Sequence, residues 1–325
     1  MMSRKESLLA TYNHEPHDHV GTFSDMCMIG GTAEYFEVGP MGGGFDSYGV
    51  KWGPNRSALG ASVPLVGYEV FDDITEWESK VEFPDIAKID WDKVVGPGLE
   101  KYDSEKQILE YALVSGPFLR LVYLMGFENG LIAMFEEPEA CRDFFNAYTD
   151  YRVDLLQYVI EHFHPDSVCL GDDMCTVNGP FFSMDIYRDE LKECHRRMVQ
   201  TVKSYDLPVV FHMCGKGDDF PDEFAEIGCD VWQVCEPRND LDRHMTKHKD
   251  DLAFFGCYDT LTPLTQGTPS EDDIRKSVDD CIDKYAPYGN FAILAVLMSL
   301  DVEETMRRTM ISEPEVIRYG TNYYK

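Results

Sequence analysis

The sequence predicts an α/β protein built as a (β/α)8 barrel of the TIM-barrel type, with an N-terminal extension over the mouth of the barrel. Two observations predict this fold. From about residue 105 onward, short apolar segments alternate with helical segments, and such alternation implies parallel strands joined by right-handed crossovers. The chain of 325 residues also has room for this many strand–helix units in one structural unit. A barrel is the most economical way to close such a series.

Residues 1–104 are expected to form the extension. An opening helix comes first, followed by a segment that contains three histidines and Pro16. Because the proline interrupts this segment and no second ligand cluster accompanies it, we interpret it as a surface loop. Residues 31–100 are rich in glycine and aromatic residues and are expected to be an irregular cap. Its aromatic side chains either face the mouth, where a planar ligand could bind, or pack the cap against the body.

The glycine-rich stretch 41–44 lies within this cap. It has neither the preceding strand nor the following Gly-Lys-Ser/Thr of a phosphate-binding loop, so we do not interpret it as a nucleotide site. We expect it to be a rim loop that can move aside.

Residues 105–325 are expected to supply the barrel. The predicted strands lie within residues 111–117, 167–173, 209–213, 230–235, 252–257 and 291–296. The predicted helices are a pair within 136–162, and single helices at about 184–204, 219–227 and 270–286.

Polar residues follow several of the predicted strands. In barrels of this type the active site lies at the C-terminal ends of the strands, so these residues are candidates for function. They are Asp172, Asp173, His212, Cys214, Cys235, Glu236, Cys257 and Asp259.

His212 and Cys214 have the spacing of a half-site for zinc. Side chains alternate along an extended segment, so residues two apart can project to the same side, and Gly215 gives the backbone freedom beyond them. Imidazole nitrogen and thiolate sulfur are preferred zinc ligands. The spacing by itself is more typical of one structural histidine beside one buried thiol, and the polar residues at the neighbouring strand ends shift the interpretation toward the metal.

Three segments resemble successive strand exits of the uroporphyrinogen decarboxylase superfamily. They are Phe211-His-Met-Cys-Gly-Lys-Gly217, Glu226-Ile-Gly-Cys-Asp-Val-Trp-Gln233 and Phe254-Phe-Gly-Cys-Tyr-Asp259. Within that superfamily His212-x-Cys214 resembles the zinc motif of the corrinoid-dependent methyltransferases. Two N-terminal segments resemble the branch that demethylates phenyl methyl ethers, namely Phe45-Asp-Ser-Tyr-Gly-Val-Lys-Trp52 and Ile74-Thr-Glu-Trp77. The arginine-rich N-terminal signature of the decarboxylases is missing.

The chain departs from the methyltransferase pattern after the last predicted strand. Related enzymes have a third zinc ligand there, a cysteine, whereas residues 295–300 contain no thiol. We expect Cys257 to take this place, because it follows a glycine at a strand exit in the same half of the barrel. Cys235 is the alternative, and Asp185 is a candidate for a fourth ligand.

The resemblance implies transfer of a methyl group from a small methylated substrate, with an aromatic methyl ether favoured, to a cob(I)alamin on a corrinoid carrier protein. Zinc would stabilise the leaving oxygen. Without zinc a general acid would have to protonate that oxygen, and Asp172, Asp173 and Tyr258 are the candidates. For Asp172 and Asp173, a structural role at a loop or helix start is an equal alternative. The rival functions are a cofactor-free decarboxylase and a corrinoid- or tetrapyrrole-binding barrel without activity.

Composition limits the remaining possibilities. A formal net charge of −30 argues against a nucleic-acid partner, because the acidic surface would repel phosphates. The ten cysteines are scattered in a way that predicts reduced thiols and not a disulfide framework. The longest apolar runs are too short for a membrane span, and the N-terminus does not have the pattern of a signal peptide. We therefore expect a cytoplasmic protein without a membrane partner.

Overall fold

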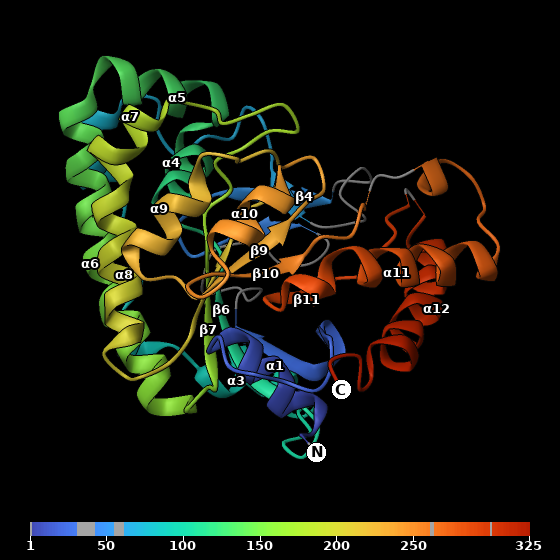
Figure 1. The fold of residues 1–325 in the computed structure, drawn as a ribbon. Coiled ribbons are helices and arrows are strands. Elements are labelled where there is room, and N and C mark those ends of the chain that lie inside the picture. The colour runs from blue at the N-terminus through green and yellow to red at the C-terminus, as the bar shows by residue number, and fades with distance from the viewer. Residues whose placement is uncertain (1, 31–42, 55–61, 261–262, 300) are drawn as a thin grey trace.

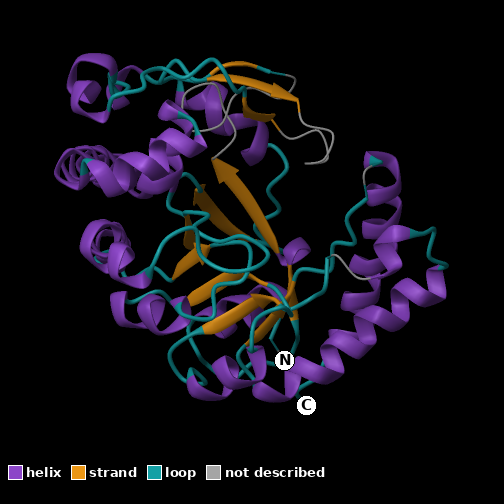
Figure 2. Cartoon of the chain, turned by 90° about the horizontal axis from the view of Figure 1, so that it is seen from above, coloured by secondary structure: helices purple, strands orange, loops and turns teal. Residues whose placement is uncertain are grey.

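The central feature of the fold is an eight-stranded parallel sheet that curls into a TIM-like barrel, with helices around it (Figures 1 and 2). The computed structural model describes residues 2–30, 43–54, 62–260, 263–299 and 301–325. The strand order is β1-β11-β10-β9-β8-β7-β6-β2. These strands are β1 (Gly21–Thr22), β2 (Met26–Gly30), β6 (Ile108–Leu113), β7 (Ser167–Gly171), β8 (Val209–His212), β9 (Val231–Cys235), β10 (Ala253–Gly256) and β11 (Phe291–Ile293).

Helices precede, connect and follow these strands. They are α1 (Arg4–Tyr12), α2 (Trp77–Lys80), α3 (Trp91–Leu99), α4 (Pro117–Met125), α5 (Phe127–Glu136), α6 (Pro138–Phe163), α7 (Met184–Ile186), α8 (Lys192–Lys203), α9 (Phe220–Ile227), α10 (Leu241–Lys247), α11 (Glu271–Tyr285) and α12 (Val302–Gly320). A small antiparallel sheet contains β3 (Gly44–Phe45), β4 (Lys51–Pro54) and β5 (Ser62–Pro64).

The two ends of the strand order are joined by one short piece of chain. β1 pairs with β11 and β2 pairs with β6, yet only the 3₁₀ turn Phe23–Asp25 separates β1 from β2. The sheet must therefore curl until its two edges meet at this segment. This differs from the predicted (β/α)8 pattern in two respects. No helix connects β1 to β2, and the sheet begins at Gly21 and not after residue 105.

Most of the predicted strands are confirmed, with small shifts at their ends. The first strand after residue 105 is β6, which begins three residues earlier than predicted. The pair of helices predicted within 136–162 is wrong, because α6 is one continuous helix of 26 residues. The predicted helix at 184–204 consists of α7, a π-helical segment (Tyr187–Leu191) and α8 in direct succession. The sequence analysis missed α4 and α5, which bend by 114° at Gly126.

The core has an inner and an outer layer. Val210, Cys169 and Phe255 belong to a cluster inside the curled sheet, which Leu8 and Tyr12 of α1 join. The residues next to Val210 in β8 pack instead in the larger cluster between the sheet and the surrounding helices. This alternation is the period of two that an extended strand imposes. It determines which polar residues at the strand ends face the inside of the barrel.

The N-terminal region supplies strands to the barrel and lines part of a cavity described below. Of the predicted rim loop 41–44, residues 41 and 42 lie outside the described residues. Among the described helices, none is by itself both long and apolar enough to cross a membrane; α4 and α5 reach such a composition only when taken together across their bend.

Candidate functional site

Asp173, His212 and Cys214 form a cluster at the carboxyl ends of β7 and β8. In β7 the inward residue Cys169 is followed at even spacing by Gly171 and Asp173, and in β8 the inward Val210 is followed by His212. Strand alternation therefore directs Asp173 and His212 to the inner side, and the register pairs Gly171 with His212. Cys214 follows two residues later, after the strand has ended.

The potential ligand atoms of these three residues lie within 4.8 Å of one another. Cys214 Sγ is 3.5 Å from His212 Nε2, and the backbone N–H of Cys214 donates to Asp173 Oδ1 at 2.8 Å. In tetrahedral zinc, with Zn–S near 2.3 Å and Zn–N near 2.0 Å, the sulfur and nitrogen ligands are about 3.5 Å apart. The donor set and spacing of the cluster therefore fit a zinc ion.

Gln233 of β9 fixes the orientation of His212. The register pairs the two residues on neighbouring strands, and His212 Nδ1 is 3.0 Å from Gln233 Oε1. An amide oxygen only accepts hydrogen bonds, so Nδ1 carries the proton and Nε2 presents its lone pair toward Cys214. Such a partner behind a histidine is typical of metal ligands in proteins.

The loop after β8 is held in place by the loop after β9. Glu236 accepts a hydrogen bond from the backbone of Gly215 at 3.0 Å, and Asn239 accepts one from Gly217 at 2.8 Å. Gly215 has φ +95°, and a Cβ there would lie 2.6 Å from the carbonyl oxygen of Thr176. Glycine is therefore required at this turn, which determines where Cys214 lies.

Cys214 is the one cysteine of the ten whose side chain is exposed, and it lies on a cavity wall. Protein atoms surround the thiol on its other sides. The resulting desolvation raises its pKa above the ordinary value, and the carboxylates of Asp173 and Glu236 raise it further. Without a bound cation the thiol is therefore protonated at neutral pH.

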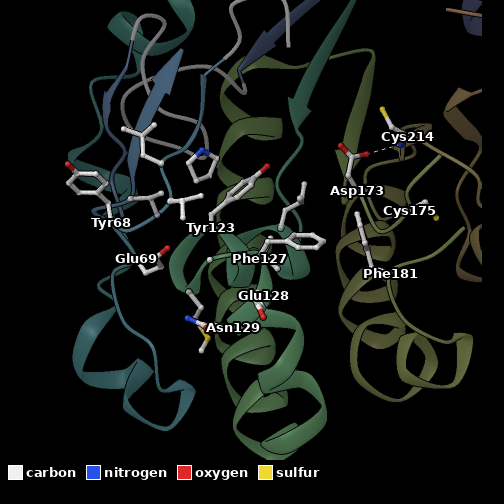
Figure 3. Close-up of a pocket in the computed structure, with 18 residues that line it drawn as sticks. Tyr68, Glu69, Tyr123, Phe127, Glu128, Asn129, Asp173, Cys175, Phe181 and Cys214 are labelled. Carbon is white, nitrogen blue, oxygen red and sulfur yellow. Dashed lines mark hydrogen bonds between the residues drawn. The ribbon is translucent and has the colours of Figure 1, made fainter. Parts of the chain in front are cut away.

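Two cavities meet at the cluster. The larger, about 600 Å³, is lined by Cys214, Asp173 and residues of α4, α5 and the segment 64–69 (Figure 3). The smaller, about 340 Å³, is lined by His212, Gln233 and apolar residues of the barrel mouth. Asp173, Leu119 and Tyr123 line both cavities. A molecule in either cavity would therefore reach the cluster.

Asp172 lies in a different environment from its neighbour. It is buried and accepts hydrogen bonds from Phe118 N (3.1 Å) and Leu119 N (2.8 Å) in the first turn of α4. His195 Nε2 of α8 is 3.0 Å from Asp172 Oδ2, the same oxygen that accepts from Phe118 N. A carboxylate in this position satisfies N–H groups that have no partner within the helix. The geometry therefore favours the structural role considered for Asp172, and not proton donation to a substrate.

The structure does not bring Cys257 to the cluster. The register of β10 against β9 shifts between Phe255 and Gly256, and Cys257 has φ +55°. The period of two is thereby broken, so Cys257 packs in the outer layer, with its sulfur 3.4 Å from that of Cys235. Cys235, the alternative for the third ligand, packs in the same outer cluster. Asp173 is the described residue that completes the set.

Two further predicted residues also lie elsewhere. Tyr258 is buried, and its hydroxyl is 2.6 Å from Ser277 Oγ of α11; burial raises the pKa of its phenol to about 12. Asp185, proposed as a fourth ligand, has a side chain that is 90% exposed and faces Arg188. Neither residue lines the two cavities at the cluster.

The sequence analysis missed Gln233 and Tyr123. Gln233 is a polar residue inside a buried strand, and this position was the signal that could have identified it. Tyr123 lines both cavities from α4. Burial, despite some relief from neighbouring groups, raises the pKa of its phenol, so Tyr123 is a protonated hydrogen-bond donor at neutral pH. The sequence gives no comparable signal for Tyr123, because α4 itself was not predicted.

A curled parallel sheet with a cluster of candidate ligands at its carboxyl end defines a TIM-barrel-like α/β protein with a candidate active site in the expected place. The chain belongs to the uroporphyrinogen decarboxylase (URO-D) family, whose model matches residues 101–305. This confirms the superfamily to which the sequence motifs pointed.

A solved structure with a similar fold is a methyltransferase from Methanosarcina mazei. It is 12% identical in sequence, the match covers 98% of this chain and 99% of that chain, and the TM-score is 0.63. At 12% sequence identity, this similarity supports a shared fold. No curated protein shows a significant match to the sequence.

Proposed function

We propose that this protein is a methyltransferase that takes the methyl group from a methylated substrate, with an aromatic methyl ether as the favoured class. The acceptor is a cob(I)alamin on a separate corrinoid carrier protein. The observation that carries the proposal is the Asp173–His212–Cys214 cluster, which lies where two cavities meet. Family membership and the resemblance of His212-x-Cys214 to the zinc motif of the corrinoid-dependent methyltransferases support it.

In this reaction the bond between the methyl carbon and the substrate oxygen breaks, and the oxygen keeps the electron pair. The corrinoid on the carrier protein, as the methyl acceptor, would supply the electron pair for the new bond to carbon. Asp173, His212 and Cys214 would hold zinc, and the bound ion would supply a Lewis acid for the leaving oxygen. One carboxylate, one thiolate and one neutral imidazole would balance its charge.

The residues around the cluster have separate tasks in this proposal. Gln233 keeps the Nε2 lone pair of His212 directed toward the site. The aromatic walls of the larger cavity exclude water and hold a ring. Tyr123, a neutral phenol on the wall of both cavities, can donate a hydrogen bond to the departing oxygen.

A cofactor-free decarboxylase is the rival enzyme suggested by the family name. Such an enzyme needs cationic or amide donors around the carboxylates of its substrate. Among the described residues that line the two cavities, none is lysine or arginine, and the acidic residues Glu69, Glu128 and Asp173 are present instead. This lining favours the methyltransferase over the decarboxylase.

Metal content is the first test. The purified chain is expected to bind about one zinc per molecule, measured by elemental analysis after dialysis. Cys214→Ser should remove most of the metal, whereas Cys257→Ala, in the outer layer, should retain it. Circular dichroism should show that both variants are folded. Equal zinc in all three proteins would place the metal elsewhere.

Methyl transfer is the second test. The chain is incubated with a reduced corrinoid carrier protein and a panel of methoxyarenes, and the methylated corrinoid is followed by its absorbance. We expect transfer with the parent chain and nearly none with Cys214→Ser. Tight corrinoid binding by this chain without any transfer would favour the non-catalytic binding barrel.

A further inference from the structure

The larger cavity has chemically different ends, and they define what it can bind. Asp173 and Cys214 lie at one end, and Glu69, Glu128 and Asn129 lie at the other (Figure 3). The wall between them is apolar and aromatic. Phe127 and Phe181 meet edge to face, with ring centroids 4.7 Å apart. The space of about 600 Å³ is sufficient for a small substituted arene.

We propose that this cavity selects methylated arenes that carry a cationic group at the end of the ring away from the methyl ether, and that it discriminates against arenes with a carboxylate there. This inference rests on the proposed function for the position of the methyl group. It deepens that function by naming a substrate class. Glu69 and Glu128 are the residues that determine the preference.

Glu69 is held at the far end by contacts with backbone. Gly67 N donates a hydrogen bond to Glu69 Oε1 at 2.9 Å. The Glu69 side chain also packs closely against Gly126, because a Cβ atom built on that glycine would lie 3.1 Å from Glu69 Cγ. The adjacent Val70 N donates to Leu124 O of α4 at 2.8 Å, which ties this segment to the helix. The N–H of Gly67 lowers the pKa of Glu69 below its usual value, so the side chain is a carboxylate at neutral pH.

Glu128 approaches the same end from the first turn of α5. A carboxylate is favourable in the first turn of a helix, where backbone N–H groups have no helical partner. Glu69 and Glu128 come from segments that meet at Gly126, the bend between α4 and α5. Two carboxylates thus line the part of the cavity that lies away from the candidate ligands.

No described lining residue offsets this charge. Lys51 Nζ lies 3.8 Å from the ring centroid of Tyr68, but Lys51 itself does not line the cavity. A ligand carboxylate would therefore lose part of its hydration beside like charges. A ligand ammonium would find two acceptors, with Asn129 as a third polar group. Because Glu69 and Glu128 are exposed, salt screens the effect, and a difference of about tenfold in affinity is the expected size.

Three ligands of nearly the same shape test the inference. They are 4-methoxybenzylamine, 4-methoxybenzyl alcohol and 4-methoxybenzoate, which differ in the charge at the end of the ring away from the ether. Their affinities for the full chain are measured by calorimetry without a corrinoid carrier, at low and high ionic strength. We expect the amine to bind about tenfold more tightly than the benzoate at low salt, with the alcohol between them. This difference should shrink at high salt.

Variants assign the preference to residues. The double variant Glu69→Gln/Glu128→Gln should weaken binding of the amine, strengthen binding of the benzoate and leave the alcohol nearly unchanged. Glu136→Gln/Glu137→Gln is the matched control, because it removes the same two charges from the other end of α5, where neither residue lines the cavity. Equal affinities for amine and benzoate, no binding of any ligand, or the same shift in the control would overturn the inference.

The two proposals can fail separately. If the amine is preferred and the double variant reverses this, but no methyl group reaches a corrinoid, the cavity preference stands and the proposed function falls. If methyl transfer occurs and the benzoate is the better ligand, the function stands and the substrate class is wrong.

Discussion

Asp172 and Asp173 are adjacent in sequence but have opposite surroundings. Strand β7 ends just before them, at Gly171, and the alternation of its side chains between the inner and outer faces of the sheet continues through both residues. Asp173 therefore lies on the cavity side, while Asp172 is buried toward α4 and α8. One residue can contact a metal or a substrate, and the other holds two helices to the sheet.

Gln233 provides a prediction at the scale of single residues. Gln233→Leu keeps the size of the side chain roughly but removes the acceptor for His212 Nδ1. The imidazole can then rotate or adopt the other tautomer, and zinc affinity should fall by about 10- to 100-fold. Competition with a chelator of known affinity measures this change.

Gln200→Leu is a control for the substitution itself, because Gln200 lies on α8, where its side-chain amide donates to Ile227 O at 2.8 Å, and it does not line the two cavities at the cluster. Zinc affinity should be unchanged in this variant. Unchanged affinity in Gln233→Leu as well would show that His212 is held by other contacts or that it is not a ligand.

Asp172 provides a prediction at the scale of elements. Asp172→Ala leaves His195 Nε2 and two N–H groups of α4 without their acceptor in a buried environment. The free energy of unfolding should fall by about 2–4 kcal/mol, as is typical when one partner of a buried charged network is removed. Urea denaturation measures it, and bound zinc should be retained in the folded protein.

Asp185→Ala is the comparison, because the Asp185 side chain is almost fully exposed and its ion pair with Arg188 spans 3.6 Å. Exposed pairs of this kind contribute little. The stability of this variant should match that of the parent chain. If Asp172→Ala were equally stable but lost methyl transfer, the catalytic role first considered for Asp172 would be restored.

The sequence revealed most strands of the barrel because they are short apolar runs between turn signals. It missed β1, which has only two residues, and α4, which begins at Pro117, the last residue of the predicted strand-turn segment. It placed His212 and Cys214 together because a period of two needs only local information. Cys257 was misplaced for a related reason, since a register shift and a positive φ interrupt that period and neither is visible in the residue pattern.

At the scale of the whole molecule, the interior of the curled sheet has a polar group below the candidate site. Glu110 of β6 is buried inside, where its Oε2 accepts a hydrogen bond from Ser167 Oγ at 2.9 Å. The hydroxyl of Tyr12, which is buried inside the barrel, also interacts with this carboxyl group. Burial raises the pKa of Glu110 to about 7, although the hydroxyls of Ser167 and Tyr12 act to lower it.

The stability of the molecule should therefore depend on pH through Glu110. Between the usual pKa of 4.5 and the folded pKa of about 7, the folded protein keeps this proton while the unfolded chain releases it. The folded state binds more protons, so the free energy of unfolding decreases as pH rises through this window and levels off above it. The glutamine in Glu110→Gln is uncharged at every pH, so this variant should lack the decrease in the free energy of unfolding that Glu110 causes.

Comparing the parent chain with Glu110→Gln isolates the contribution of Glu110 to the pH dependence of stability, because all other titratable groups are the same in both proteins. At pH 4, below the unfolded pKa, the two should be almost equally stable, and at pH 8 Glu110→Gln should be more stable by up to about 3 kcal/mol. Urea denaturation at both pH values measures the difference. Glu139→Gln, on the exposed first turn of α6, should show no such dependence. A variant that is less stable than the parent at pH 8 would mean that Glu110 is ionised in the folded barrel and has a cationic or polar partner there.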